Sequence, residues 1–409
     1  MNTRAERIRE TIDRELPSLL DLYRRLHAHP ELSGEEETTS RTLAAELEKA
    51  GFAVSGGIGG YGIVGVRSSG EGPVVMIRAD MDALPVTEET GLPYASRIVA
   101  KRPDGSTVGV MHACGHDIHM SVLAGTARLL ADLVDEWEGT LLLVGQPAEE
   151  TGRGAISMIH DGIFTRFPVP DSALALHVGP DLPKGIIGYR EGIFSAGSES
   201  LDIDIRGIGG HAAHPDRAID PVVLAARIIL ALQTIVSREL PPLEFGVVTV
   251  ASIHGGTKYN AIPDTVSLQA NIRYFSEQVR EKILESIRRI TKNLALSAGV
   301  PEDLLPEVAI AAESVPPLVN DTVLTERVSS TLRDHLGGER VVRIDPLTGS
   351  EDFGFFGMQE PRVPLCYFRV GTGGGPYLHN SRFAPDPGPA ISLGIFCMAV
   401  AALELLKKK

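Results

Sequence analysis

Apolar positions recur along the chain with two spacings, one typical of helices and one typical of buried strands. Helical spacing predicts helices over residues 3–28, 35–50 and Ile118–Val134. Short apolar or β-branched runs predict strands over Gly62–Arg67, Pro73–Ala79, Gly139–Gly145 and Ser172–Val178. Strands that alternate with helices in this way indicate an α/β domain of three layers, with a mostly parallel sheet between helices.

The pattern changes near Phe194. Glu199–Arg206 alternates polar and apolar residues, as in a strand that is half exposed. Asp220 and Pro221 then begin a helix, as an N-cap and the first helical residue do. The following elements are predicted over Phe245–His254, Thr265–Tyr274, Ser276–Leu296 and Glu307–Ala311. This β-α-β-β-α-β order is ferredoxin-like.

We therefore expect residues 194–312 to form a small α+β domain that is inserted into a larger domain. The alternation of helices and buried strands seen before residue 194 resumes afterwards, with a helix near 321–335, a strand over Pro364–Val370 and a C-terminal helix. The larger domain would then consist of residues 1–193 and 313–409. A length of 409 residues agrees with two or three domains of ordinary size.

Charge and composition exclude several classes of protein. Acidic residues outnumber basic residues by 53 to 39, a formal net charge of −14, which disfavours nucleic acid and anionic membranes as partners. Three cysteines are too few and too sparse for a disulfide framework. The apolar stretch Ile391–Leu406 is too short to span a bilayer and is expected to be a buried core helix. The N-terminus is charged and lacks an apolar segment, so we expect a cytoplasmic protein.

The densest chemical cluster is a short segment that begins at His112. His112, Cys114, His116 and His119 offer thiolate and imidazole ligands within eight residues, around a glycine at position 115. These donors suit one or more transition-metal ions. An alternative is a helix N-terminus with incidental histidines, but four potential His or Cys ligands in eight residues favour a metal site.

Carboxylates follow two of the predicted buried strands. Glu149 and Glu150 come after Gly139–Gly145, where α/β proteins bind ligands, and one carboxylate could hold a metal while the other takes a proton from water. Asp80 and Asp82 end another strand and could ligate a metal or support a ligating imidazole. Either pair could instead belong to an ordinary polar turn.

Three further histidines are weaker candidates by themselves. His177 closes an apolar strand, His379 follows a glycine-rich loop, and His211 lies in the segment GIGGHAAHP of the inserted domain. A separate motif, G-x-G-x-x-G at Gly57–Gly62, runs into a strand rather than a helix. We therefore interpret it as a turn and not as a dinucleotide site.

Taken together, these segments resemble the two-metal amidohydrolases of the aminoacylase and glutamate-carboxypeptidase superfamily. The nearest branch contains hippurate hydrolases, plant indoleacetyl-amino-acid hydrolases and bacterial N-acyl-amino-acid amidohydrolases. The resemblance extends over nearly the whole chain, through the segments Leu26–Ser33, Arg78–Pro85, His112–His119, Gln146–Glu150, Gly207–Pro215, Asn260–Asp264, Gly349–Phe353 and Leu378–Phe383.

The resemblance implies a metal-dependent hydrolase that cleaves N-acyl amino acids to a carboxylate and a free amino acid. Two divalent ions, manganese or zinc with cobalt or nickel as alternatives, would be held by Cys114, His116, Glu150, His177 and His379. Cys114 stands where most relatives have a bridging aspartate, and Asp80 stands where they have a ligating histidine. The superfamily pattern also implies a homodimer or a dimer-based tetramer, in which the inserted domain provides the contact and closes as a lid.

The same resemblance assigns roles around the metals. Glu149 would be the general base, and Asp82 would support a ligand from behind. His211 would polarise the scissile carbonyl, within its own subunit or across a dimer, while Asn260 and Arg273 would bind the substrate carboxylate. Alternatives are a carboxypeptidase or dipeptidase with the same metals, a thiol hydrolase with Cys114 as nucleophile, and a binding protein on an inactive hydrolase scaffold.

Overall fold

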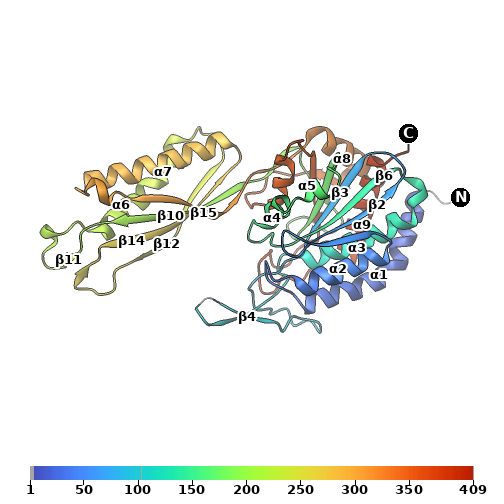
Figure 1. Ribbon diagram of the computed structural model, residues 1–409, viewed down its shortest axis with the longest axis horizontal. Coiled ribbons are helices and arrows are strands. Elements are labelled where there is room, and N and C mark those ends of the chain that lie inside the picture. Colours follow the sequence, from blue (N-terminus) through green and yellow to red (C-terminus); the bar gives the residue numbers. More distant parts are fainter. Residues whose placement is uncertain (1–3, 103, 409) are drawn as a thin grey trace. The chain divides into compact units, whose positions relative to one another are not determined.

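The computed structural model describes residues 4–102 and 104–408, which form two compact units (Figure 1). The first unit comprises Met1–Phe194, Val319–Pro346 and Asp352–Lys409. The second comprises Ser195–Leu318 together with Leu347–Glu351, a short segment that the sequence analysis placed in the larger domain. Residue 3, the first of the predicted N-terminal helix, lies outside the described residues.

The first unit is built on an eight-stranded mixed sheet whose central strands run parallel. The strand order is β1-β2-β6-β3-β7-β18-β8-β17. The bounds are β1 Ala53–Ile58, β2 Gly62–Ser69, β3 Val74–Asp80, β6 Gly139–Gln146, β7 Ser172–Gly179, β8 Ile187–Tyr189, β17 Val341–Arg343 and β18 Leu365–Gly371. The pairs β6–β3, β3–β7 and β7–β18 are parallel. The predicted mostly parallel sheet is therefore confirmed, and the carboxyl ends of its central strands lie at one edge.

Helices cover both faces of this sheet. Alternate residues of β3 point to opposite sides, so Val75 and Ile77 enter the large apolar core while Arg78 lies on the other face against the Phe353 ring. The core face is covered by α1 Arg4–Ala28, α2 Glu37–Lys49, α3 His116–Asp132, α8 Thr322–Leu336 and α9 Pro387–Leu405. The Arg78 face carries α4 Gly154–His160, α5 Ile163–Arg166 and the 3-10 helix Asp352–Met358.

Two described helices, Pro221–Glu239 and Pro387–Leu405, are long and apolar enough to cross a membrane by length and composition alone. The second is α9, and 78% of its most apolar window is buried inside the protein. Cys397 on this helix is completely buried. The expectation of a buried C-terminal core helix is therefore correct.

The second unit is a four-stranded antiparallel sheet with two helices. Its elements are β10 Gly197–Arg206, α6 Pro221–Thr234, β12 Gly246–Gly255, β14 Thr265–Tyr274, α7 Glu277–Ser297 and β15 Glu307–Val315. The strand order β12-β14-β10-β15 and the chain order match the predicted ferredoxin-like arrangement. A two-stranded ladder, β11 Gly210–His211 with β13 Ala261–Ile262, lies beyond this sheet. The remaining short strands are β4 Val99–Lys101, β5 Thr107–Gly109, β9 Gly192–Ser195 and β16 Leu318–Asn320.

The glycine motif at residues 57–62 forms the turn between β1 and β2, which pair antiparallel. Gly59 has φ of +63°, and a Cβ there would come within 2.4 Å of the Met158 backbone nitrogen. Glycine is thus required by both the turn and the close approach of α4. The interpretation as a turn is correct, because a strand and not a helix follows the motif.

Candidate metal centre

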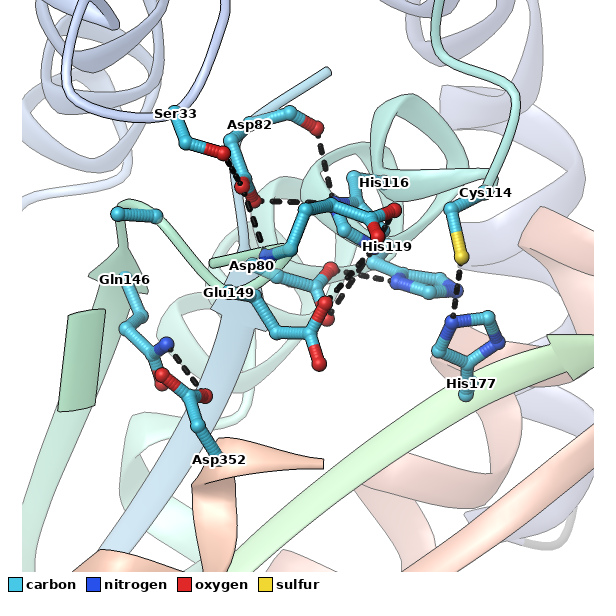
Figure 2. Close-up of polar contacts among 12 residues, drawn as sticks. Ser33, Asp80, Asp82, Cys114, His116, His119, Gln146, Glu149, His177 and Asp352 are labelled. Carbon is cyan, nitrogen blue, oxygen red and sulfur yellow. Dashed lines mark hydrogen bonds and ion pairs between the residues drawn. The ribbon is translucent and has the colours of Figure 1, made fainter. Parts of the chain in front are cut away.

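The candidate site lies at the carboxyl ends of three neighbouring strands. Asp80 ends β3, the loop with Glu149 follows β6, and His177 lies near the end of β7. The start of α3 adds Cys114 and His116 on either side of Gly115, whose φ is +83°. Figure 2 shows the side chains of Cys114, His116, Glu149 and His177 turned toward one common region. Parallel strands bring these distant segments together, as α/β proteins do at ligand sites.

All five residues that the resemblance names as metal ligands belong to two overlapping groups. Cys114, His116 and His177 form one group, and Cys114, Glu150 and His379 form the other; within each, the ligand atoms lie within 4.8 Å of one another. The Cys114 Sγ is 3.3 Å from His177 Nε2, and Glu150 Oε2 is 3.4 Å from His379 Nε2. Separations of roughly 3.3 to 3.8 Å are those between neighbouring ligands of one tetrahedral zinc ion.

Backbone contacts orient two of these imidazoles. His116 Nδ1 lies 2.9 Å from the carbonyl oxygen of Asp82 and donates its hydrogen there. His177 Nδ1 donates in the same way to the carbonyl oxygen of Val178, at 2.7 Å. Each ring therefore turns Nε2 toward the site, and its neutral form would present there the lone pair that a metal requires.

Two atoms in the site are buried without a hydrogen-bond partner among the described residues. They are Nε2 of His116 and Oε1 of Glu150, which lie 3.9 Å apart. A buried polar atom that bonds to nothing costs free energy, so both atoms favour bound cations in the site. A mixed set of sulfur, nitrogen and oxygen donors suits zinc and its neighbours in the first transition series. The residues present therefore fit a divalent metal.

Cys114 is 6% exposed and has the surroundings of a ligand rather than of a free nucleophile. Burial, followed by the negative charges of Glu150 and Glu149, raises the pKa of the Cys114 thiol well above its usual value. Reactive cysteines occupy electropositive sites that lower the thiol pKa. The arrangement disfavours the thiol-hydrolase alternative, since a thiolate here needs nearby cations.

Asp80 and His119 bond to each other and not to the open site. The Asp80 oxygens accept from Arg78 at 2.6 Å and from His119 Nδ1 at 2.6 Å. His119 Nε2 in turn accepts the backbone N–H of Val178 at 3.0 Å. Asp80, His116 and His119 form a further group whose ligand atoms lie within 4.8 Å of one another, but both ring nitrogens of His119 already have hydrogen-bond partners. Of the two roles considered for Asp80, direct ligation and support of an imidazole, the contacts agree with support.

Asp82 links the site to the turn before α2. Its Oδ2 accepts from the Ser33 hydroxyl at 2.6 Å and from the Glu150 backbone N–H at 2.9 Å (Figure 2). Its Oδ1 lies 3.2 Å from His116 Nδ1. Burial raises the pKa of Asp82, but the contacts with His116, Ser33 and Glu150 outweigh burial and hold it below its usual value. Asp82 thus contacts two candidate ligand residues, His116 and Glu150, and belongs to neither ligand group itself.

A buried polar network on the other face of the sheet also reaches the site. Arg78 donates to Gln146 at 2.9 Å and to Asp352 at 3.1 Å, and Gln146 donates to Asp352 at 2.7 Å. Sequence reasoning did not assign roles to Arg78, Gln146, Asp352, Ser33 or Glu36. The first four lie in segments that carry the family resemblance, which was their only signal, and Glu36 lies in none of those segments. His112 is also buried, and neither ring nitrogen has a partner among the described residues.

The other predicted site residues belong to the second unit. His211 is exposed in β11, and its Nδ1 accepts the Ala213 backbone N–H at 3.1 Å, so a neutral ring carries its hydrogen on Nε2. The carbonyl of Asn260 accepts from the neighbouring Ala212. Arg273 donates to Asn271 at 2.9 Å and to Ser350 at 3.1 Å. His211 and Asn260 are thus neighbours, whereas Arg273 lies elsewhere in the unit.

Comparisons with known proteins identify relatives over most of the chain. The model of Peptidase family M20/M25/M40 matches residues 76–396. The chain is 39% identical over 375 residues to IAA-amino acid hydrolase ILR1-like 4 of Arabidopsis thaliana, covering 91% of this chain and 79% of that protein. It is 34% identical over 379 residues to N-acetyl-L-cysteine deacetylase of Bacillus subtilis, covering 92% and 86%.

A solved structure of a dinuclear metal binding peptidase of the M20 family from Bacillus subtilis also matches. Its TM-score is 0.80 at 30% identity, and the match covers 96% of this chain and 99% of that chain. The fold and these relatives define a hydrolase of amide bonds. The chain belongs to peptidase family M20/M25/M40.

Proposed function

We propose that this protein hydrolyses N-acyl amino acids with two divalent metal ions. The observation that carries the proposal is the pair of ligand groups that share Cys114. One ion would be held by Cys114, His116 and His177, and the other by Cys114, Glu150 and His379. The names of the two relatives, a deacetylase of an N-acetyl amino acid and a hydrolase of amino acid conjugates, support this substrate class.

Glu149 would be the general base of the reaction. Its Oε2 lies 3.9 Å from His116 Nε2, so it borders the metal groups, and it forms a candidate cluster with His116 and Glu150. Divalent ions held by these residues would supply a positive charge that lowers the pKa of a bound water. Glu149 would take the proton of that water and return it to the amine that leaves when the amide bond breaks.

Arg273 would bind the carboxylate of the amino acid. It is half-buried, and no carboxylate pairs with it among the residues that the structure describes. A half-buried guanidinium without a counter-ion is costly, and it matches a free carboxylate in a bidentate geometry. This contact would explain a preference for acyl amino acids over neutral amides.

His211 and Asn260 would act across a dimer. Both lie beyond the Thr265 end of β14, whereas Arg273 is near the other end of the same strand. The eight residue steps from Thr265 to Arg273 span about 26 Å at roughly 3.3 Å per step. One substrate molecule therefore cannot contact both sets within a single copy of the second unit. A partner subunit that provides His211 would resolve this, with Nε2–H donating to the scissile carbonyl.

The surface of α6 supports such a dimer. Val222, Val223 and Leu230 on this helix are 43%, 58% and 72% exposed, and Ile253 on the edge strand β12 is 50% exposed. Apolar side chains gathered on one helix and an adjacent edge strand are typical of a subunit interface. A homodimer, or a tetramer built from dimers, would cover them. In either assembly the second unit would act as the lid.

The test is a panel of N-acetyl and N-benzoyl amino acids, in which the acyl group and the amino acid vary separately. Chelation should abolish hydrolysis, and added Mn²⁺, Zn²⁺, Co²⁺ or Ni²⁺ should restore it to degrees that identify the preferred metal. Blocked amides without a carboxylate are the matched controls. A preference for unblocked dipeptides would favour the peptidase alternative, and unchanged activity without metal would reject the proposal. A cytoplasmic location remains a prediction.

A further inference from the structure

Glu36 is completely buried at the start of α2, yet its carboxylate does not serve that helix. It stands at the N-cap position and makes no capping hydrogen bond. Glu31 caps the helix instead, since its carboxylate accepts the backbone N–H groups of Thr38 at 3.1 Å and Thr39 at 2.7 Å. Burial of a carboxylate is expensive unless its contacts are needed elsewhere. The contacts of Glu36 therefore call for a separate explanation.

The Glu36 carboxylate bonds to the loop after β6. Its Oε1 accepts the Ala148 backbone N–H at 2.8 Å and the Gly34 backbone N–H at 2.9 Å. Its Oε2 is buried without a hydrogen-bond partner among the described residues. Ala148 directly precedes Glu149 and Glu150, the proposed base and a proposed ligand. One carboxylate oxygen thus connects the turn before α2 to the two acidic residues of the site.

Ala148 has an unusual backbone conformation. Its φ is +51°, and among the described residues the only other non-glycine residue with positive φ is His379, a member of one of the two ligand groups. Side chains with a Cβ rarely adopt this conformation, and surrounding contacts must maintain it. The Ala148 carbonyl oxygen accepts the backbone N–H groups of Arg153 at 3.2 Å and Gly154 at 3.1 Å. The Ala148 N–H is held by Glu36.

We propose that Glu36 is a positioning residue, which holds the Ala148 amide so that the strained turn presents Glu149 and Glu150 to the metal site. This inference rests on the proposed function. Asp82 holds the next part of the loop through the Glu150 N–H, so two buried carboxylates bond to neighbouring backbone amides of the loop. Burial raises the pKa of Glu36 to about 7, although its backbone hydrogen bonds oppose the rise. A protonated carboxyl still accepts through its carbonyl oxygen, so the contact does not require the charge.

The experiment compares Glu36→Gln with Glu36→Leu in the metal-loaded enzyme. The amide oxygen of glutamine can still accept the Ala148 N–H, whereas leucine has a similar volume and no acceptor. We expect Glu36→Leu to lower kcat by about 10- to 100-fold with KM changed less than about twofold, as misplaced catalytic groups do. Glu36→Gln should stay within about threefold of the wild type. Equal losses for the two variants would overturn the proposal.

A second readout does not depend on turnover. In the metal-free protein, Glu36→Leu should speed hydrogen exchange at the Ala148 amide by at least about tenfold, while Glu36→Gln should leave it slow. The matched control is Glu31→Ala, which removes the α2 cap and should lower stability without altering Ala148 exchange. If Glu36→Leu does not fold, Glu36→Ala, which admits water, takes its place. Unchanged Ala148 exchange would overturn the positioning role, whereas a wild type that cleaves no N-acyl amino acid would overturn only the proposed function.

Discussion

His119 accepts the backbone N–H of Val178 through Nε2 at 3.0 Å, directly after the proposed ligand His177. The other ring nitrogen bonds to Asp80, which Arg78 holds in turn. All these groups are buried. His119 therefore connects β3 to the end of β7 and supports the strand segment from which His177 faces Cys114.

Loss of this support should weaken metal binding. We predict that His119→Leu lowers the affinity for divalent metal by about 10- to 100-fold, because neighbours of metal ligands usually have effects of this size. Competition with a chromophoric chelator would measure the change. His112→Leu is the matched control, since neither ring nitrogen of His112 has a partner among the described residues. Equal losses in the two variants would show that the effect is only on packing.

Glu149→Gln should separate metal binding from catalysis. The amide cannot accept the proton of a water, so kcat should fall by about 10²- to 10⁴-fold, the usual contribution of a general base. Metal content, measured by elemental analysis, should stay at the wild-type level because Glu149 belongs to neither of the two proposed ligand groups. Near-normal turnover would remove Glu149 from the role of base.

Thiol chemistry can separate a ligand from a nucleophile at Cys114. With metal bound, Cys114 should resist alkylation. Removal of the metal should allow slow labelling that becomes faster at alkaline pH, because the free thiol is buried and its pKa is raised. Mass spectrometry of the labelled peptide would assign the site, with buried Cys366 as the internal control. Equal labelling with and without metal, together with loss of activity, would instead support the thiol-hydrolase alternative.

The α6 surface predicts an effect on assembly. Leu230→Glu should shift the protein to monomers in analytical ultracentrifugation, because a charge cannot be buried in an apolar interface without a partner. Activity should fall with it if His211 acts across the dimer. Leu243→Glu is the control, since Leu243 is fully exposed but lies outside α6. A wild type that is monomeric at micromolar concentration would contradict the dimer.

His27 predicts a dependence of stability on pH. Burial lowers the pKa of His27, but hydrogen bonds with Asp117 at 2.7 Å and Glu88 at 3.1 Å outweigh it and raise the pKa to about 10. The folded state therefore binds this proton more tightly than the unfolded state, whose pKa is near 6.5. The stabilisation is complete below about pH 6.5 and disappears as the pH rises toward 10.

The measurement is the free energy of unfolding of the metal-free protein between pH 6 and pH 10, by denaturant titration. The wild type should lose on the order of a few kcal/mol over this interval relative to His27→Gln, which has no such proton. Parallel curves for the two proteins would mean that the His27 imidazole is neutral in the folded state.

Much of the fold was predictable because it depends on local spacing. Val75 and Ile77 point into one face of the sheet, and Glu199–Arg206 alternates as expected for β10. The strand order and the inclusion of Leu347–Glu351 in the second unit were not predictable, since pairing between distant segments leaves no local pattern.

By itself, the sequence determined the elements of both units, the segments that carry the chemistry and the family resemblance. Only the tertiary structure decided which side-chain atoms are hydrogen-bonded and which are left to bind a metal. Both oxygens of Asp80 and both nitrogens of His119 are bonded elsewhere, whereas Nε2 of His116 is left for a ligand. Glu36 appears in the sequence as one acid among several before α2, and its contact with Ala148 arises from folding alone. The reason is physical: a side chain's role depends on which donors and acceptors surround it, and around this site they come from segments up to 274 residues apart.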